Sequence, residues 1–183
     1  MAAKRVNIVV AACNNQGIGI DGRIPWRLKK DMAMFRRITS STNDNKQNAV
    51  IMGRKTWHSI PEKFRPLPNR FNIVLSNSMK ESPIGVHLVR SFQEAMDLVN
   101  NGELSDRVES IFVIGGYSVY REAMAWPSCR VYLTRVLADF HCDTFMPDIS
   151  AESFRKTDNP KWLPDTEQEE GSIKFSYEVY DKH

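Results

Sequence analysis

The stretch IFVIGGYSVY, residues 111–120, has the pattern of a strand that runs straight into a helix. Its first four residues are apolar, and two glycines then precede a helical pattern. The stretch NAVIMGRKT, residues 48–56, repeats this arrangement with one glycine. Short, continuously apolar strands followed at once by helices are typical of a parallel sheet covered on both faces. These two stretches therefore predict an α/β fold.

The same alternation extends in both directions along the chain. Apolar, β-branched runs predict strands at Val6–Ala12, Ala49–Met52, Phe71–Leu75, Val86–Val89, Ser110–Ile114 and Val131–Val136. Helical spacing of apolar residues predicts helices at Leu28–Ile38, Thr56–Ile60, Phe92–Val99 and Val119–Met124. The last segment, Ile173–Tyr180, alternates apolar and polar residues, which indicates a half-buried antiparallel strand. We expect a mostly parallel sheet that ends in this strand, with helices on both faces.

Length and composition are those of one globular domain over residues 1–183, with 42% apolar and 26% charged residues. The apolar run at residues 6–13 is short for a signal peptide and contains Asn7, so a strand fits it better. No segment approaches the roughly 20 apolar residues of a membrane-spanning helix. The three cysteines have no metal-binding spacing. We expect reduced, buried thiols, no bound metal and a cytoplasmic location.

Charge is unevenly distributed along the chain. Residues 1–90 hold 16 Lys and Arg against 5 Asp and Glu, whereas the remainder holds 9 against 17. Either folding mixes these charges over one surface, or the first half gathers contacts to an anionic ligand. A nucleic-acid-binding surface is disfavoured, because the net charge is only +3 and no basic run is interleaved with aromatic residues.

The segment GIGIDG, residues 17–22, matches the dinucleotide-binding pattern G-x-G-x-x-G only in its letters. That motif needs a helix to open within the glycines, but here Arg23-Ile24-Pro25-Trp26 follows and the helical pattern begins later. The segment favours a mobile loop that crosses a binding site; the alternative is a purely structural turn.

Asp31 lies inside the apolar stripe of the helix predicted next. At 100° per residue it falls in one arc with Leu28, Met32, Phe35 and Ile38. Burying a carboxylate costs several kcal/mol unless a partner binds it. Asp31 either interacts with the free amides and dipole at the helix start or grips a polar ligand in an apolar cleft. The stripe alone leaves both alternatives open.

The two strand-to-helix junctions are suited to phosphate groups. Helix N-termini favour anions through their dipole and their unpaired N–H groups. One junction adds basic side chains at Arg54 and Lys55, and the other adds the flexible pair Gly115-Gly116. Two such junctions in one alternating chain indicate a dinucleotide ligand.

At this point the chain resembles the dihydrofolate reductase family over nearly its whole length. The matching segments, in family order, are GIGIDGRIPW (17–26), Asp31 with Phe35, VIMGRKTWHSIP (50–61), RPLPNR (65–70), FVIGGYSVY (112–120), VYLTRV (131–136), DTFMPDI (143–149) and FSYEVY (175–180). The resemblance implies an eight-stranded, mostly parallel sheet and a monofunctional reductase of 7,8-dihydrofolate that uses NADPH. Five residues lead from Trp26 to Asp31, as in bacterial members that use Asp, whereas RPLPNR and DTFMPDI are similar to eukaryotic members.

The resemblance also implies roles at the substrate side. Asp31 matches the carboxylate that binds the pterin and promotes protonation at N5, Thr134 the hydroxyl bonded to it, and Trp26 the residue that holds a water nearby. Arg70 matches the guanidinium that takes the glutamate tail, a bidentate task suited to Arg. The pocket lining then comprises Val9, Val10, Ala11, Ile24, Met32, Phe35, Ile60, Leu67, Ile114 and Tyr120, with Ala11, Ile114 and Tyr120 also facing the cofactor.

On the cofactor side, the resemblance implies a loop over the nicotinamide, two phosphate-binding helix starts and a 2′-phosphate site. It implies a cis peptide between Gly115 and Gly116, and Asn77 stands where many relatives have a basic residue. The implied cofactor residues are Gly17, Ile18, Gly19, Ile20, Asp21, Gly22, Arg23, Arg54, Lys55, Thr56, Ser76, Asn77, Ser78, Arg90, Gly115, Gly116, Tyr117, Ser118, Val119, Arg121 and Glu122.

Two rival functions remain compatible with the fold. One is a reductase of another pterin or pyrimidine, which would not need Arg70; the other is a nucleotide-binding module that has lost its chemistry, which would not need Asp31, Thr134 and Trp26. We expect folate and antifolate ligands, a monomer, and no need for nucleic acid or membrane.

Overall fold

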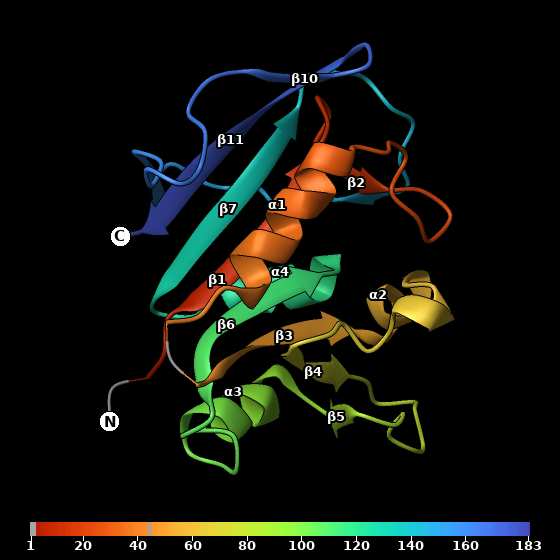
Figure 1. Cartoon of the computed structure of the whole chain (residues 1–183), viewed down its shortest axis with the longest axis vertical. Coiled ribbons are helices and arrows are strands. Elements are labelled where there is room, and N and C mark those ends of the chain that lie inside the picture. Colours follow the sequence, from red (N-terminus) through yellow and green to blue (C-terminus); the bar gives the residue numbers. More distant parts are fainter. Residues whose placement is uncertain (1–2, 44) are drawn as a thin grey trace.

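The computed structural model describes residues 3–43 and 45–183, and a twisted central sheet organises them (Figure 1). Its strands follow the path β10 (Gln168–Glu170), β11 (Ile173–Lys182), β7 (Cys129–Val136), β1 (Val6–Ala12), β6 (Val108–Gly115), β3 (Gln47–Gly53), β4 (Arg70–Leu75) and β5 (Val86–Val89). Every pairing from β7 to β5 is parallel, and β11 is antiparallel to both β7 and β10. The predicted eight-stranded, mostly parallel sheet with an antiparallel C-terminal strand is confirmed.

Three further short strands complete the described part of the chain. β9 (Phe154–Thr157) pairs with β11 outside the eight-strand path, and β2 (Gly17–Gly19) pairs with β8 (Thr144–Phe145) in a separate small sheet. The sequence patterns predicted none of these three, nor β10. Each has only two to four residues, too few for a periodic signal.

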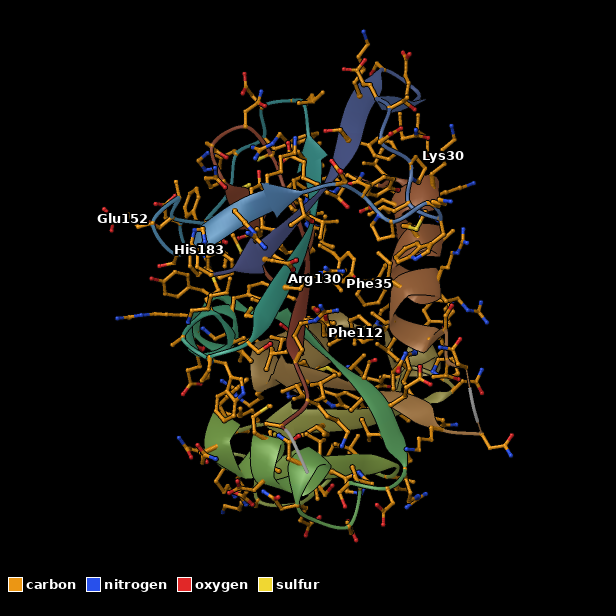
Figure 2. The ribbon with its side chains drawn as sticks, turned by 90° about the vertical axis from the view of Figure 1, so that its left-hand side faces the viewer. Lys30, Phe35, Phe112, Arg130, Glu152 and His183 are labelled. Atoms are coloured by element: carbon orange, nitrogen blue, oxygen red, sulfur yellow. The ribbon has the colours of Figure 1, made fainter. Side chains whose placement is uncertain are left out.

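The helices are α1 (Lys29–Ser40), α2 (Arg54–Ser59), α3 (Phe92–Asn100) and α4 (Tyr117–Met124), with one 3₁₀ turn, η1, at Glu62–Phe64. All four predicted helices are present. Alternate residues of β1 show how the helices are distributed: Ile8 and Val10 pack in the core with α3 and α4, whereas Val9 packs in the core with α1 and α2. Figure 2 shows Phe35 of α1 and Phe112 of β6 on the facing sides of helix and sheet. Helices therefore cover both faces, as predicted.

The N-terminal segment and the cysteines follow the sequence-based expectations. Val6–Ala12 is a central strand, and Cys13, Cys129 and Cys142 are buried free thiols. Burial raises the pKa of Cys129 to about 12, so this thiol stays in its unreactive form. Among the described residues, no helix has the length and apolar character needed to cross a membrane.

Candidate active site

A cleft of about 1620 Å³ opens at the carboxyl ends of β1, β3 and β6. Ligands of open α/β sheets bind in this position, outside the carboxyl ends of the strands. The two glycine junctions of the sequence, at Gly53 and at Gly115-Gly116, both lie on its wall together with residues of α1 between Asp31 and Ile38. The cleft thus brings together segments that are more than 80 residues apart.

Asp31 lies on this wall, where a hydroxyl from the sheet meets it. The Oγ1 atom of Thr134 on β7 donates a hydrogen bond of 2.7 Å to Oδ1 of Asp31. Burial raises the pKa of Asp31, the bond from Thr134 opposes that shift, and the charge of Glu170 adds to it. One carboxylate therefore faces an apolar cleft with a single protein hydrogen bond among the described residues.

The alternative for Asp31, a helix-start carboxylate bonded to amides, does not describe this structure. The backbone N–H groups of Lys29 and Lys30 donate to Oε2 and Oε1 of Glu170, at 2.8 and 2.9 Å. Glu170 on β10 therefore occupies the place that Asp31 would take in that alternative.

Aromatic and apolar side chains surround the carboxylate. Trp26 is buried, with its ring centroid 5.3 Å from that of Phe140. Tyr177 of β11 lies opposite Thr134 in the strand register, and burial followed by the charge of Asp31 raises the pKa of Tyr177. Ile24 and Met32 are 59% and 60% exposed although they line the cleft, so their apolar surface is open toward it. Such surface is available to an apolar ring system.

Arg70 lines the same cleft and is firmly held. Its Nε donates to the carbonyl oxygen of Pro68 at 2.9 Å, and its Nη1 donates to Oγ1 of Thr39 at 2.9 Å. Burial and the neighbouring charge of Arg36 lower the pKa of Arg70. A fixed guanidinium with unused donors, close to a second cation, suits an anionic group such as a carboxylate.

Both helix starts on the cleft wall lack a side-chain cap. α2 begins after Gly53 and α4 after Gly116, and neither of these positions has a side chain that could accept from the first amides. The peptide between Gly115 and Gly116 is cis, as expected. A Cβ atom at Gly115 would lie 3.2 Å from Oγ1 of Thr56 and 3.3 Å from the hydroxyl of Tyr120. The junction therefore leaves free N–H groups in a narrow space that a side chain would fill.

The glycine segment forms a short hairpin beside the cleft and does not start a helix, in agreement with the sequence-based interpretation. Ile20 and Arg23 pair across a tight turn in which Asp21 and Gly22 have φ values of 50° and 74°. The carboxylate of Asp143 accepts the amide of Asp21 at 3.0 Å, and the amide of Asp143 donates to the carbonyl of Gly19 at 2.9 Å. β8 and its neighbour Asp143 thereby anchor this hairpin.

Most of the site residues predicted from the sequence line the one cleft. Thirty of them do so: Val9, Val10, Ala11, Ile18, Gly19, Ile20, Gly22, Arg23, Ile24, Trp26, Asp31, Met32, Phe35, Arg54, Lys55, Thr56, Ile60, Leu67, Arg70, Ser76, Asn77, Ser78, Ile114, Gly115, Gly116, Tyr117, Ser118, Val119, Tyr120 and Thr134. Five lie off its wall: Gly17, Asp21, Arg90, Arg121 and Glu122. Arg90 is nevertheless adjacent, because its Nη1 donates to the carbonyl of the wall residue Ser76 at 2.9 Å.

The structure adds residues that the sequence reasoning missed. Tyr177, Asp143 and Lys63 also line the cleft, and Glu170 caps α1 from outside it. The basic side chains on the wall all come from residues 1–90, namely Arg23, Arg27, Arg36, Arg54, Lys55, Lys63 and Arg70. This clustering favours the interpretation that the basic first half of the chain meets an anionic ligand.

Comparison with known proteins places the chain in a family. A family model described as dihydrofolate reductase matches residues 5–182. The chain belongs to the dihydrofolate reductase family. It is 48% identical to the dihydrofolate reductase of Drosophila melanogaster over 98% of each chain. It is 44% identical to that of Sus scrofa over 97% of this chain and 98% of the relative.

A solved dihydrofolate reductase, from Schistosoma mansoni, has the same architecture. It superposes with a TM-score of 0.88 at 41% identity, and the match covers 98% of this chain and 99% of that one. Dihydrofolate reductases are oxidoreductases of folate metabolism that convert dihydrofolate to tetrahydrofolate. The chain therefore has both the sequence and the fold of an enzyme of this family.

Proposed function

We propose that this protein catalyses the NADPH-dependent reduction of 7,8-dihydrofolate to 5,6,7,8-tetrahydrofolate, with Asp31 as the acidic group of the site. The observation that carries the proposal is the Asp31 carboxylate, bonded to Thr134 at 2.7 Å on the wall of a cleft that also carries two uncapped helix starts. Family membership supports the reaction, and the cleft supplies the means for it.

Asp31 promotes the protonation step of the reaction. Reduction of the C6–N5 imine needs a proton on N5 as the hydride reaches C6, and a nearby negative charge stabilises that protonated form. Thr134 occupies one lone pair of one carboxylate oxygen, which leaves both oxygens able to accept from the 2-amino group and N3 of the pterin. Trp26 packs on Phe140 and closes the cleft beside the carboxylate, where we propose that it holds a water.

The cleft fits the cofactor by its donor set. When bound, NADPH supplies the hydride that is transferred to C6. The helix starts at Arg54-Lys55-Thr56 and at Gly116–Val119 offer amides to its phosphates, and the cis Gly115-Gly116 junction lets backbone approach closely. Ser76, Asn77 and Ser78, with Arg90 behind them, form the site for the 2′-phosphate.

The substrate lies between Asp31 and Arg70. Phe35, Ile60 and Leu67 line the cleft between them and contact the ring that links the pterin to the glutamate. Arg70 binds the α-carboxylate of that glutamate. We further propose that residues 1–183 act as one domain, as a cytoplasmic monomer, and that antifolates bind in the same cleft.

The test is a spectrophotometric assay of NADPH oxidation on addition of dihydrofolate, with dihydrobiopterin as the competing substrate. We expect dihydrofolate to be reduced with the higher kcat/KM, because dihydrobiopterin lacks the tail that Arg70 binds. A preference for dihydrobiopterin would identify a reductase of another pterin. Cofactor binding without oxidation of NADPH by either substrate would identify a non-catalytic module.

A further inference from the structure

The N-terminus of α1 is not capped by its own sequence. The first amides of a helix have no acceptor within the helix, and Leu28, at the N-cap position, has no side-chain acceptor to offer. Asp31 is the acidic residue of the first turn, but its carboxylate is bonded to Thr134 instead. The helix that carries Asp31 therefore depends on an acceptor from elsewhere in the chain.

Glu170 supplies that acceptor with both of its carboxylate oxygens. Oε2 accepts from the amide of Lys29 at 2.8 Å, and Oε1 accepts from the amide of Lys30 at 2.9 Å. The Nζ atom of Lys30 also donates to the carbonyl oxygen of Glu169 at 3.1 Å. Figure 1 shows β10 beyond the upper end of α1, and Figure 2 labels Lys30 at that end. Three hydrogen bonds thus tie β10 to the start of α1.

Neighbouring strands of one sheet bind the start of α1 and the carboxylate of Asp31. Glu170 pairs with Ile173 at the start of β11, and further along β11 Tyr177 pairs with Thr134, the hydroxyl bonded to Asp31. The helix start is therefore fixed to one neighbour of β11 and the Asp31 carboxylate to the other. Their relative position depends on the β10–β11–β7 ladder.

The groups that face Asp31 include one other carboxylate. Thr134 on β7 bonds to it, Tyr177 faces it from β11, and Glu170 acts on it from β10. Lys29 and Lys30 on its own helix are exposed. The amides of Lys30 and Lys29 lower the pKa of Glu170, so Glu170 stays charged, and its charge raises the pKa of Asp31.

We propose that Glu170 is a positioning residue for the reaction: it caps α1 from β10 and thereby leaves Asp31 free to face the substrate. A first-turn carboxylate otherwise interacts favourably with the amides and dipole of its own helix. With the amides taken by Glu170, Asp31 loses that alternative and keeps its orientation toward Thr134 and the cleft. This inference rests on the proposed function of Asp31.

The test compares Glu170→Gln with Glu169→Gln, a matched control whose carboxylate makes no hydrogen bond or ion pair among the described residues. The first readout is hydrogen exchange at the amides of Lys29 and Lys30, which have no acceptor within the helix. We expect exchange about tenfold faster or more in Glu170→Gln and unchanged in Glu169→Gln, because a charge-assisted bond is replaced by a neutral one.

The second readout is the affinity for 2,4-diaminopyrimidine as a function of pH. Binding weakens as pH falls through the pKa of Asp31, because the neutral acid no longer attracts the cationic ring. Removing the charge of Glu170 lowers that pKa. We therefore expect the acid limb, the part of the curve where affinity falls with pH, to lie at lower pH in Glu170→Gln. Unchanged exchange would overturn the cap and with it the proposal, and an unchanged acid limb would overturn the influence of Glu170 on Asp31.

Failure of the proposed function is distinguished by Asp31→Asn. If the acid limb persists in that variant, Asp31 is not the group that binds the ring, and the catalytic meaning of the cap is overturned with it. The exchange measurement does not depend on any ligand, so it reports on the cap separately.

Discussion

At the scale of single residues, the site depends on a buried carboxylate whose negative charge is only partly stabilised by the protein. Asp31 has the bond from Thr134, but burial and the charge of Glu170 both disfavour its ionised form. A ligand with an N–H donor or a positive charge can supply the hydrogen bond or ion pair that Asp31 lacks in the free protein. The same feature that costs stability in the free protein thus suits the protonated pterin that we propose as its ligand.

Asp31→Asn tests this on activity. Asparagine keeps the shape and still accepts from Thr134, but it removes the negative charge that favours protonation at N5. We expect hydride transfer at pH 7 to fall by about 10²–10⁴-fold, the usual worth of general acid–base catalysis, with NADPH affinity nearly unchanged. Pre-steady-state measurements from pH 5 to 8 should show the defect shrinking in acid. A rate like that of the unmodified protein at pH 7 would exclude Asp31 from this role.

The same substitution should act on stability in the opposite direction. Because burial raises the pKa of Asp31, the folded chain binds more protons at this carboxyl than the unfolded chain between the two pKa values. The free energy of unfolding therefore decreases as pH rises through that window, and the penalty persists at neutral pH. Urea unfolding should find Asp31→Asn more stable than the parent at pH 7. The difference should vanish toward pH about 4, the ordinary range of an Asp carboxyl.

Arg70 tests the tail of the substrate. Arg70→Leu should weaken folate-type ligands by about 1.5–3 kcal/mol, the typical worth of a hydrogen bond to a charged group. Arg70→Lys keeps the charge but loses the planar fork, so it should recover only part of that affinity. A small diaminopyrimidine has no tail and serves as the control ligand in calorimetric titrations. Equal weakening of both ligand classes would mean that Arg70 supports the fold and does not bind the tail.

At the scale of elements, the hairpin of residues 17–23 depends on a close contact with Cys142. A Cβ atom at Gly17 would lie 2.3 Å from Sγ and 2.7 Å from Cβ of Cys142, whereas at Gly19 the nearest atom is the carbonyl oxygen of Arg23 at 3.3 Å. Gly17→Ala should therefore separate β2 from β8 and cost about 1–3 kcal/mol. Gly19→Ala, in the same strand, is the matched control with a smaller loss. Urea unfolding and single-turnover hydride transfer would measure both, and equal losses would refute the contact argument.

The elements also show what sequence reasoning can and cannot reach. Strands such as Val6–Ala12 and helices such as Phe92–Asn100 carry a continuous or periodic apolar pattern, so their positions could be predicted. β10 could not, because its three residues, Gln168–Glu170, are polar and form a strand only through pairing with β11. For the same reason nothing in the sequence pointed to Glu170, whose importance comes from the helix start that folding brings to it.

The candidate site divides in the same way. Asp31 was identifiable because a charged residue interrupts an apolar stripe, and the helix starts because glycines follow apolar strands. Thr134 and Arg70 carry no local signal, and the family resemblance supplied them. Neither the sequence pattern nor the family resemblance assigned a role to Asp143 or Tyr177. Their position on the cleft wall depends on how β8 and β11 pack in the folded chain.

At the scale of the whole molecule, folding concentrates the charge of one half of the chain. Every basic side chain on the cleft wall comes from residues 1–90, and the acidic second half contributes Asp143 and Glu178 to the wall. Such a wall attracts anionic ligands through a field that salt screens. Both proposed ligands, a folate with its carboxylates and a dinucleotide phosphate, are anions.

Cofactor choice follows from this charge distribution, and we expect NADPH to be preferred over NADH. A 2′-phosphate carries nearly two negative charges and loses hydration on binding, so cations and donors must compensate. Arg54 and Ser76 lie on the cleft wall, and Arg90 stands behind Ser76 with one guanidinium nitrogen already bonded to its carbonyl. The hydroxyl oxygen of Ser76 accepts from the amides of Ser78 and Met79 and lies 3.3 Å from the hydroxyl oxygen of Ser78, so two hydroxyl groups stand together here.

The proposed 2′-phosphate site can be tested by measuring the dissociation constants of NADPH and NADH in variants of residues 77–90. Arg90→Ala should weaken NADPH by about 1.5–3 kcal/mol and NADH far less, because only NADPH has the phosphate. Lys80→Ala, which removes an exposed cation that is not on the cleft wall, is the matched control and should leave the ratio of the two dissociation constants unchanged.

Asn77→Arg adds a cation on the wall and should strengthen the binding of NADPH alone. Raising the salt concentration should narrow the preference in the unmodified protein, since screening weakens the phosphate contacts more than the apolar ones. A preference for NADH would show that the cleft has no site for the 2′-phosphate, and equal losses for both cofactors in Arg90→Ala would place the phosphate away from Arg90.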